Sequence, residues 1–141
     1  MAIFSLTKKA DYGLSLLAYL SEKGRGGRVS LAEMEKRGMP RPFMAQIANS
    51  LVVAGILNSK EGRGGGYALN YNPSTIQVKE ALEAIEGSDV APVSCVASPG
   101  SCPVEKSCGQ RSFMGMFTSQ IEKMLESYSL ADLTISKNVA K

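Results

Sequence analysis

The sequence predicts a mainly α-helical chain with one small β-hairpin, and three observations lead to this fold class. Apolar residues recur at helical spacing in several runs, most of them bounded by a capping residue or a glycine. Short β-type segments occur at one place only, on either side of a glycine-rich stretch. The composition, 44% hydrophobic and 21% charged over 141 residues, is that of one folded domain, or of one domain with an appendage.

The first two predicted helices are marked by their ends. Thr7 is a suitable N-cap for a helix whose apolar residues follow at helical spacing, and Gly24 is a suitable stop. Ser30 and Glu33 have the spacing of a capping box, which opens a short helix that ends near Gly38.

A turn with two prolines, at residues 39–42, leads into a third helix that runs to about Ala54. Gly55 stops this helix. Its inner face is expected to carry Phe43, Ile47 and Leu51. Its outer face would present Arg41, Pro42, Ala45, Gln46 and Asn49.

The hairpin follows at once and completes a recognisable plan. Residues 56–58 and 67–69 read as short strands, and the turn between them places Arg63 between Gly62 and Gly64. Three small helices and a hairpin make residues 1–72 a predicted winged helix-turn-helix domain. Such a domain suits DNA, because a helix fits the major groove and a hairpin loop can reach the neighbouring minor groove.

Residues 73–141 are expected to form a second unit. Ser74 or Thr75 would cap a fourth helix at about 78–86. Residues from about 88 to 108 are rich in Pro, Ser, Gly and Cys without periodicity, which predicts a long loop. A long helix at about 110–128 follows, then a short turn from Ser129 and a frayed tail.

The long C-terminal helix carries a wide apolar stripe. Its members are Phe113, Phe117, Ile121, Met124, Leu125 and Tyr128, and Met114 and Met116 widen it. A single helix of this kind would expose too much apolar surface in a monomer, which favours a two-fold homodimer built on it. The alternative is that the helix packs across its own winged domain.

The net charge of +3 is unevenly distributed along the chain. Ten basic and five acidic side chains give residues 1–72 a charge of +5, whereas six basic and eight acidic side chains give residues 73–141 a charge of −2. A basic first half suits a polyanionic partner such as double-stranded DNA. Ordinary scatter of surface charge is the other interpretation.

The predicted DNA contacts follow from side-chain chemistry. Gln46 and Asn49 can each pair with adenine through two hydrogen bonds, and Arg41 can reach guanine or phosphate. The helix that opens at Ser30 offers its first amides to a phosphate. Arg63 suits a narrow, electronegative minor groove, although a glycine-rich turn without any partner is the simpler interpretation of the hairpin tip.

Histidine is absent, and this excludes several classes of site. A Ser-His-Asp triad, a Cys-His dyad and a Cys/His zinc site all need it. No base stands beside any cysteine and there is no C-x-x-C motif, so we expect no enzyme. The chain has no run of roughly 18 apolar residues and no signal-peptide pattern, so we expect a cytoplasmic protein without a membrane partner.

The three cysteines, Cys95, Cys102 and Cys108, lie in the predicted long loop. Their spacing is too wide for the usual zinc knuckles, and three sulfurs are too few for a closed set of disulfides. An iron–sulfur cluster accepts three thiolates and a fourth ligand of another type. Three free thiols, or one redox disulfide with a spare thiol, remain equally open on these residues alone.

The chain resembles the cluster-sensing winged-helix regulators of bacteria, the family of IscR and NsrR. The resemblance covers nearly the whole chain. It rests on LTKKADYGLSLLAYL, SLAEMEKRGMPRPFMAQI, LVVAGILNSKEGRGGGYAL, IQVKEALEAIEG, the three-Cys loop and the terminal SLADL. It implies a homodimeric transcription regulator with a palindromic operator. It also implies that the cysteines hold a [2Fe-2S] or [4Fe-4S] cluster that senses iron–sulfur status, redox state or nitric oxide.

Departures from the family pattern bear on the fourth cluster ligand and on the operator. Arg111 stands where some members place a ligating histidine, and Asp11 matches an aspartate that other members supply from the second subunit. Glu105 is the rival ligand within the loop, and solvent or a small thiol is a third option. Ala45 replaces a glutamate that selects operators in some members, and Glu61 stands where the wing often carries arginine.

A cluster-free alternative remains at this stage. The same winged-helix regulator could respond through oxidation of its thiols, or through another ligand, with no cluster.

Overall fold

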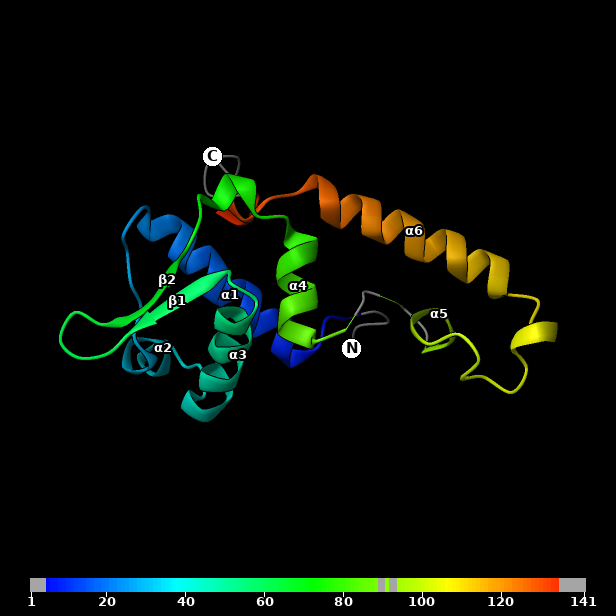
Figure 1. The fold of residues 1–141 in the computed structure, drawn as a ribbon, viewed down its shortest axis with the longest axis horizontal. Helices are drawn as coiled ribbons and strands as arrows, with labels where there is room; N and C mark the ends of the chain where they lie inside the picture. Colours follow the sequence, from blue (N-terminus) through cyan, green and yellow to red (C-terminus); the bar gives the residue numbers. More distant parts are fainter. Residues whose placement is uncertain (1–4, 89–90, 92–93, 135–141) are drawn as a thin grey trace.

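The computed structural model describes residues 5–88, 91 and 94–134, and the predicted frayed tail at residues 136–141 lies outside them. The helices and strands are α1 (Lys8–Lys23), α2 (Leu31–Lys36), α3 (Arg41–Val53), β1 (Leu57–Lys60), β2 (Gly66–Leu69), α4 (Val78–Glu86), α5 (Ser94–Ala97) and α6 (Arg111–Ser127). Three 3-10 turns are η1 (Pro73–Thr75), η2 (Glu105–Ser107) and η3 (Leu130–Thr134). The predicted class, mainly α with a small hairpin, is confirmed (Figure 1).

Helix α1 is bounded as the sequence predicts. The Thr7 side chain accepts a hydrogen bond from the Ala10 amide at 3.0 Å, and the helix ends at Gly24 with φ +77°. Leu16, Leu17 and Leu20 are almost completely buried. Their spacing gives α1 one apolar face, and this face forms the centre of the core.

Only half of the predicted capping box forms at α2. The Ser30 hydroxyl accepts from the Glu33 amide at 3.1 Å, which caps the helix as expected. The Glu33 carboxylate does not turn back to the cap. It pairs with the Lys23 ammonium at 3.3 Å, so it links α2 to the end of α1.

The buried face of α3 differs slightly from the predicted one. Ile47 and Leu51 are buried as expected, and Met44 and Ala48 are buried beside them. Phe43, predicted on the inner face, is only half-buried and packs edge-on against Tyr12, with ring centroids 5.6 Å apart.

Strands β1 and β2 form an antiparallel hairpin in which Leu57 faces Leu69 and Lys60 faces Gly66. We call the two strands and their connecting turn, residues 57–69, the wing. Val29 and Tyr67 exchange two backbone hydrogen bonds of 2.9 and 2.8 Å, so the loop before α2 pairs with β2 like a short third strand.

Helix α4 has its predicted bounds but not its predicted cap. Ser74 and Thr75 lie in η1, where their hydroxyls bond to Asn72. The cap position belongs to Gln77, which makes no side-chain capping bond. Gly87 ends the helix in the left-handed conformation, as expected.

The predicted loop from about 88 to 108 contains more regular structure than its composition indicates. The one-turn helix α5 and the turn η2 lie within it. Both are shorter than the window over which helical periodicity can be detected, which is why the sequence shows no sign of them.

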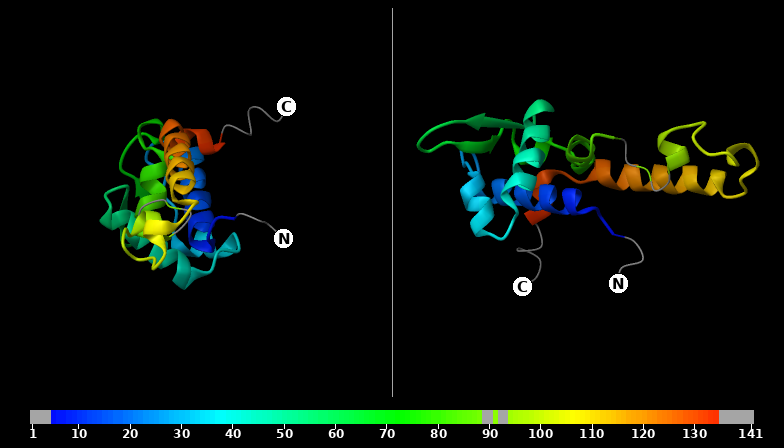
Figure 2. Two further views of the ribbon diagram at one scale, coloured as in Figure 1. Left: turned by 90° about the vertical axis from the view of Figure 1, so that its right-hand side faces the viewer. Right: turned by 90° about the horizontal axis from the view of Figure 1, so that it is seen from below.

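The core is shared across the predicted boundary at residue 72, which itself stays a prediction. Ala81 and Ile85 of α4 and Leu130 of η3 belong to the same buried cluster as α1 and α3. Helix α6 extends away from this body, and the chain from α5 to η2 lies along its outer half and around its far end (Figures 1 and 2). None of the helices within the described residues is long and apolar enough to cross a membrane.

Candidate functional site

The outer face of α3 presents the side chains predicted to read DNA. Arg41, Pro42, Gln46 and Asn49 are exposed, and Ala45 is half-buried. The side chains of Gln46 and Asn49 make no hydrogen bond within the described part of the chain. Their donors and acceptors are therefore available to a base edge.

Ser30 lies at the start of α2, where its hydroxyl already accepts from the Glu33 amide. A hydroxyl that accepts one hydrogen bond can still donate its own hydrogen, so capping and phosphate contact are compatible. The positive end of the helix dipole lies at the same place, although α2 is short.

The tip of the wing carries Arg63 in an exposed position. Gly62 and Gly64 on either side have φ values of +87° and +69°, which glycine adopts without strain. Glu61 is also exposed and lies two residues before Arg63.

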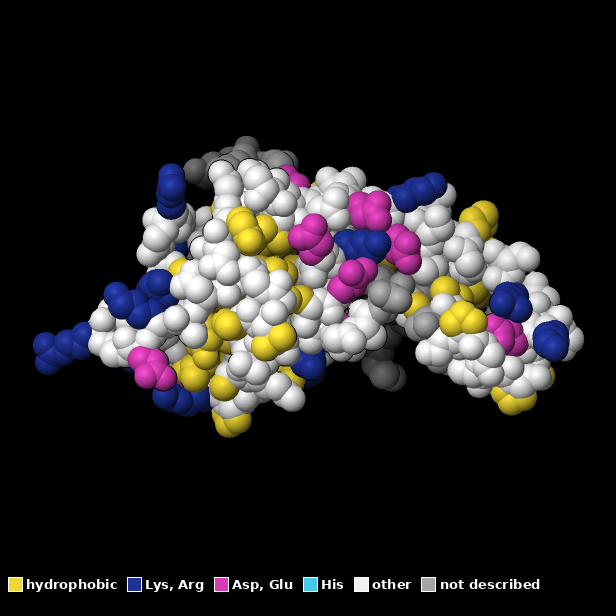
Figure 3. Space-filling view, in the orientation of Figure 1, with side chains coloured by type: hydrophobic (Ala, Val, Ile, Leu, Met, Phe, Trp, Pro, Cys, Tyr) yellow, Lys and Arg dark blue, Asp and Glu magenta, His cyan; other side chains and the backbone are white. Residues whose placement is uncertain are grey.

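Charge is distributed unevenly over the molecular surface. Figure 3 shows basic side chains over the end that carries the wing and α2, and acidic ones gathered around α4 and α6. In the acidic region the Lys79 ammonium contacts Glu126 at 3.0 Å and Glu83 at 3.7 Å. The hydrogen bond that Lys79 donates to Glu126 raises the pKa of Lys79 above its usual value.

The three cysteines lie on residues 94–108, which we call the three-Cys segment. Cys95 is in α5, Cys102 lies between α5 and η2, and Cys108 follows η2. All three are free thiols and all are half-buried. Among the described residues, no three Cys, Asp or Glu side chains lie close enough together to hold a metal ion.

Glu105, the rival fourth ligand, is held by contacts inside the segment. Its side chain is only 9% exposed, and Oε2 accepts a 2.6 Å hydrogen bond from the Gly100 amide. Arg111 Nη2 lies 3.2 Å from Oε1, close enough for an ion pair but without the geometry of a hydrogen bond. Arg111 thus neutralises this carboxylate.

Asp11, the other candidate ligand, is exposed on the first turn of α1. Helix α1 begins near the middle of the molecule, whereas the three-Cys segment lies toward the far end of α6 (Figure 1). The chain does not bring Asp11 and the cysteines into one site.

Half of the apolar stripe of α6 is open to solvent. Phe113, Met116, Met124 and Tyr128 are each more than half exposed, and only Thr118 is buried. The rings of Phe113 and Phe117 stack with their centroids 5.8 Å apart. The helix contacts α4 and α5, and Leu125 packs against the buried cluster that contains Val78 and Leu82. The other side of the stripe stays uncovered.

Sequence reasoning did not find one polar cluster at the base of the wing. It joins Arg28, Asn58 and Asn70 by side-chain hydrogen bonds. No spacing rule indicates it, because the three residues come from a glycine-rich loop, a strand and the residue after a strand.

Comparisons with known proteins agree with this architecture. The family model described as Rrf2, iron-dependent transcriptional regulator, matches residues 6–135. A helix-turn-helix transcriptional regulator of Azotobacter vinelandii is 30% identical over 135 residues, covering 95% of this chain and 81% of that protein. The regulator IscR of Aliivibrio salmonicida is 28% identical over 135 residues, covering 95% of this chain and 79% of its own.

Solved structures show the same fold. IscR of T. potens superposes with a TM-score of 0.75 at 25% identity, covering 99% of this chain and 92% of that one. CymR, the global cysteine regulator of B. subtilis, superposes with a TM-score of 0.72 at 23% identity over 94% of this chain and 97% of its own. These relatives are transcription regulators and not enzymes. The chain belongs to the Rrf2 family of DNA-binding transcriptional regulators.

Proposed function

We propose that the protein is a homodimeric regulator whose affinity for a palindromic operator is controlled by an iron–sulfur cluster held by Cys95, Cys102 and Cys108. One observation carries this proposal. The three cysteines are free, half-buried thiols on a segment that joins the winged body to the exposed helix α6. A ligand that fixes the conformation of this segment can therefore change the position of α6 relative to the winged body.

The donor set fits an iron–sulfur cluster better than it fits zinc. Structural zinc takes four nitrogen or sulfur ligands, whereas clusters are held by thiolates and accept a different fourth ligand. The thiols are not gathered in the described structure, so binding would have to reorganise the segment. Gly100, Pro99 and Pro103 break the segment into short pieces, which makes such a rearrangement feasible.

The fourth ligand is proposed to be Asp11 from the other subunit. Glu105 is engaged by the Gly100 amide and the Arg111 guanidinium, so it would have to give up both contacts to reach iron. Asp11 is exposed at the start of α1, and its carboxylate would not have to break such contacts to reach iron. A ligand from the other subunit would tie one protomer's α1 to its partner's three-Cys segment.

The proposed control acts through the geometry of the dimer. When bound, a cluster supplies iron–thiolate bonds that respond to oxidants, nitric oxide and iron supply. The cysteines would hold the segment in one arrangement and so fix the spacing of the two α3 helices. Loss of that arrangement shifts the population toward a second dimer geometry with a different affinity for DNA. The protein would act in the cytoplasm, where the DNA lies.

The DNA contacts are proposed from the exposed side chains of the winged part. Gln46, Asn49 and Arg41 of α3 would contact base edges in the major groove, and Pro42 would pack beside them. Ser30 would donate to a phosphate, and Arg63 would enter the adjacent minor groove. The side chains themselves are exposed, with the exception of the half-buried Ser30.

Anaerobic purification tests the cluster directly. The wild-type protein should be brown and should contain iron and acid-labile sulfide, and Cys102→Ser should lose both. Ser107→Ala changes an exposed hydroxyl in the same segment and should keep them. Asp11→Ala should alter the absorption spectrum, whereas Glu105→Gln should not.

Colourless wild-type protein without iron would contradict the cluster and favour a cluster-free regulator that responds through its thiols. A spectrum that is unaltered by Asp11→Ala would instead assign the fourth position to Glu105, solvent or a small thiol.

A further inference from the structure

Arg28 lies in the loop between α1 and α2, and its guanidinium holds both strands of the wing. Nη1 donates to the Gly66 carbonyl at 3.0 Å, and Nη2 donates to the Asn58 side-chain oxygen at 2.8 Å. Asn58 lies in β1 near the base of the hairpin, and Gly66 begins β2 opposite Lys60, next to the turn, so one side chain bridges the two strands. The residue is half-buried, unlike the exposed Arg25 of the same loop.

The contacts continue from the wing to the end of α3. Asn58 Nδ2 donates to Asn70 Oδ1 at 2.8 Å. Asn70 Nδ2 in turn donates to the carbonyls of Gly55 and Leu57, at 2.6 and 3.1 Å. Gly55 directly follows the last turn of α3, so this chain of side chains connects the wing to the helix proposed to read the major groove.

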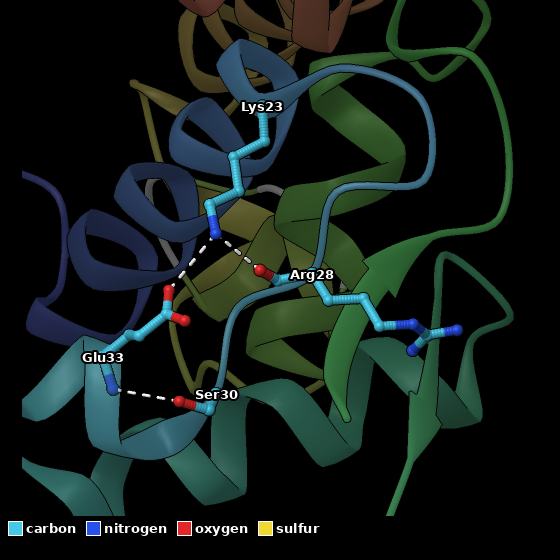
Figure 4. Close-up of polar contacts among 4 residues, drawn as sticks. All are labelled: Lys23, Arg28, Ser30 and Glu33. Carbon is cyan, nitrogen blue, oxygen red and sulfur yellow. Dashed lines mark hydrogen bonds and ion pairs between the residues drawn. The ribbon is translucent and has the colours of Figure 1, made fainter. Parts of the chain in front are cut away.

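The backbone of Arg28 is fixed as well. The Lys23 ammonium donates to the Arg28 carbonyl at 2.6 Å and contacts Glu33 Oε2 at 3.3 Å, as Figure 4 shows. The Ser30 hydroxyl accepts from the Glu33 amide in the same view. Arg28 is therefore attached to the end of α1 and the start of α2 by its main chain, and to the wing by its side chain.

The wing needs such an attachment. A hairpin of two four-residue strands is only marginally stable without packing against the rest of the domain. Arg63 lies at its tip, so a small tilt at the base displaces that side chain by a larger distance. Both terminal nitrogens of Arg28 already have acceptors in the wing, which leaves the guanidinium poorly placed to serve as a phosphate contact.

We propose that Arg28 is a positioning residue that sets the orientation of the wing relative to α2 and α3. This inference rests on the proposed role of the wing in DNA binding, and it adds a residue that does not touch DNA itself.

Amide hydrogen exchange of the free protein tests the attachment without DNA. Arg28→Ala should speed exchange at Tyr67, whose amide bonds to Val29 beside the guanidinium. Arg25→Ala removes the same charge from the same loop and should leave this exchange unchanged. Arg28→Lys should restore only part of the protection. The lysine ammonium can bond to one acceptor but cannot bridge both as the planar guanidinium does. Exchange at Tyr67 that is unchanged in Arg28→Ala overturns the proposal.

DNA binding then tests the consequence, on a duplex that the wild-type protein selects from a random-sequence library. Arg28→Ala should lower affinity about tenfold, as expected for lost hydrogen bonds to a charged group, without changing the salt slope. In the Arg28→Ala protein, the additional substitution Arg63→Ala should weaken DNA binding much less than it does in the wild-type protein. A salt slope that falls by about one unit, with normal hydrogen exchange, would make Arg28 a phosphate contact and reject the positioning role.

Asn58→Ala provides a second variant if Arg28→Ala fails to fold. It removes one acceptor of the guanidinium and should reproduce the faster exchange at Tyr67, and unchanged exchange would count against the proposal. A wild-type protein that selects no duplex would refute the proposed function, and the exchange data would still decide whether Arg28 holds the wing.

Discussion

The arginines of the first 72 residues divide by what their guanidinium groups touch. Arg28 donates to the wing, and Arg37 stacks on Tyr19 with Cζ 3.5 Å from the ring centroid. Arg41 and Arg63 are exposed and make no hydrogen bond or ion pair within the described residues. Arg28 and Arg37 are thus engaged in structural contacts, whereas Arg41 and Arg63 can contact DNA directly.

Arg63 is the residue whose removal should report most clearly on DNA. We expect Arg63→Ala to weaken binding to a selected duplex and to lower the salt slope by about one unit, since one charge no longer acts on the phosphates. Titrations of fluorescent duplex at several salt concentrations measure both quantities. Lys106→Ala removes an exposed charge in η2, outside the winged part, and is the matched control for net charge. Unchanged affinity and slope would remove the wing from the interface.

Helix caps and stops can be predicted from single residues, because the interactions that form them are local. The caps at Thr7 and Ser30 and the stop at Gly87 are confirmed, because each involves residues only a few positions apart. The Glu33–Lys23 pair was not predictable, since it joins residues that only the tertiary fold brings together.

At the scale of elements, the helix bounds were predicted closely but the faces less so. The inner face of α3 includes Met44 and Ala48 and leaves Phe43 half-buried. Periodicity gives the spacing of buried positions, whereas neighbouring elements decide which of two adjacent apolar residues is buried. Helix α5 and turn η2 are too short to show periodicity at all.

Two glycines of the wing, Gly64 and Gly66, provide a test of its packing. Gly64 and Gly66 both have positive φ, but a Cβ at Gly66 would lie 2.5 Å from the Val29 carbonyl oxygen, and one at Gly64 would meet nothing. Gly64→Ala should therefore lower the free energy of unfolding by about 1 kcal/mol through backbone strain. Gly66→Ala should lower it by about 3 kcal/mol or more.

Urea denaturation of both variants measures the difference. Equal losses would contradict the close approach of β2 to the loop before α2.

At the scale of the whole molecule, the feature that points to a partner is the group of exposed apolar side chains on α6. The sequence predicted the helix and its stripe, and the structure leaves Phe113 and Met124 about half exposed. The chain after α6 returns to the body, where Leu130 is completely buried against the shared core. That return was not predictable, because a short apolar turn carries no information about its distant partner.

A homodimer built on this stripe should be sensitive to charge. Met124→Glu places a carboxylate in the proposed interface and should convert the dimer to a monomer, measured by sedimentation velocity. Ser112→Glu adds the same charge at an exposed position outside the stripe and should stay dimeric. A Met124→Glu protein that remains dimeric would place the interface elsewhere.

Control of DNA affinity by the three-Cys segment is tested most directly by one comparison. The dissociation constant for a selected duplex is measured anaerobically on one preparation, before and after removal of its iron and sulfide. We expect the two values to differ by about tenfold or more, within the usual range of coupling between sites, and Cys102→Ser to match the cluster-free value. Equal dissociation constants in the two forms would contradict control by a cluster.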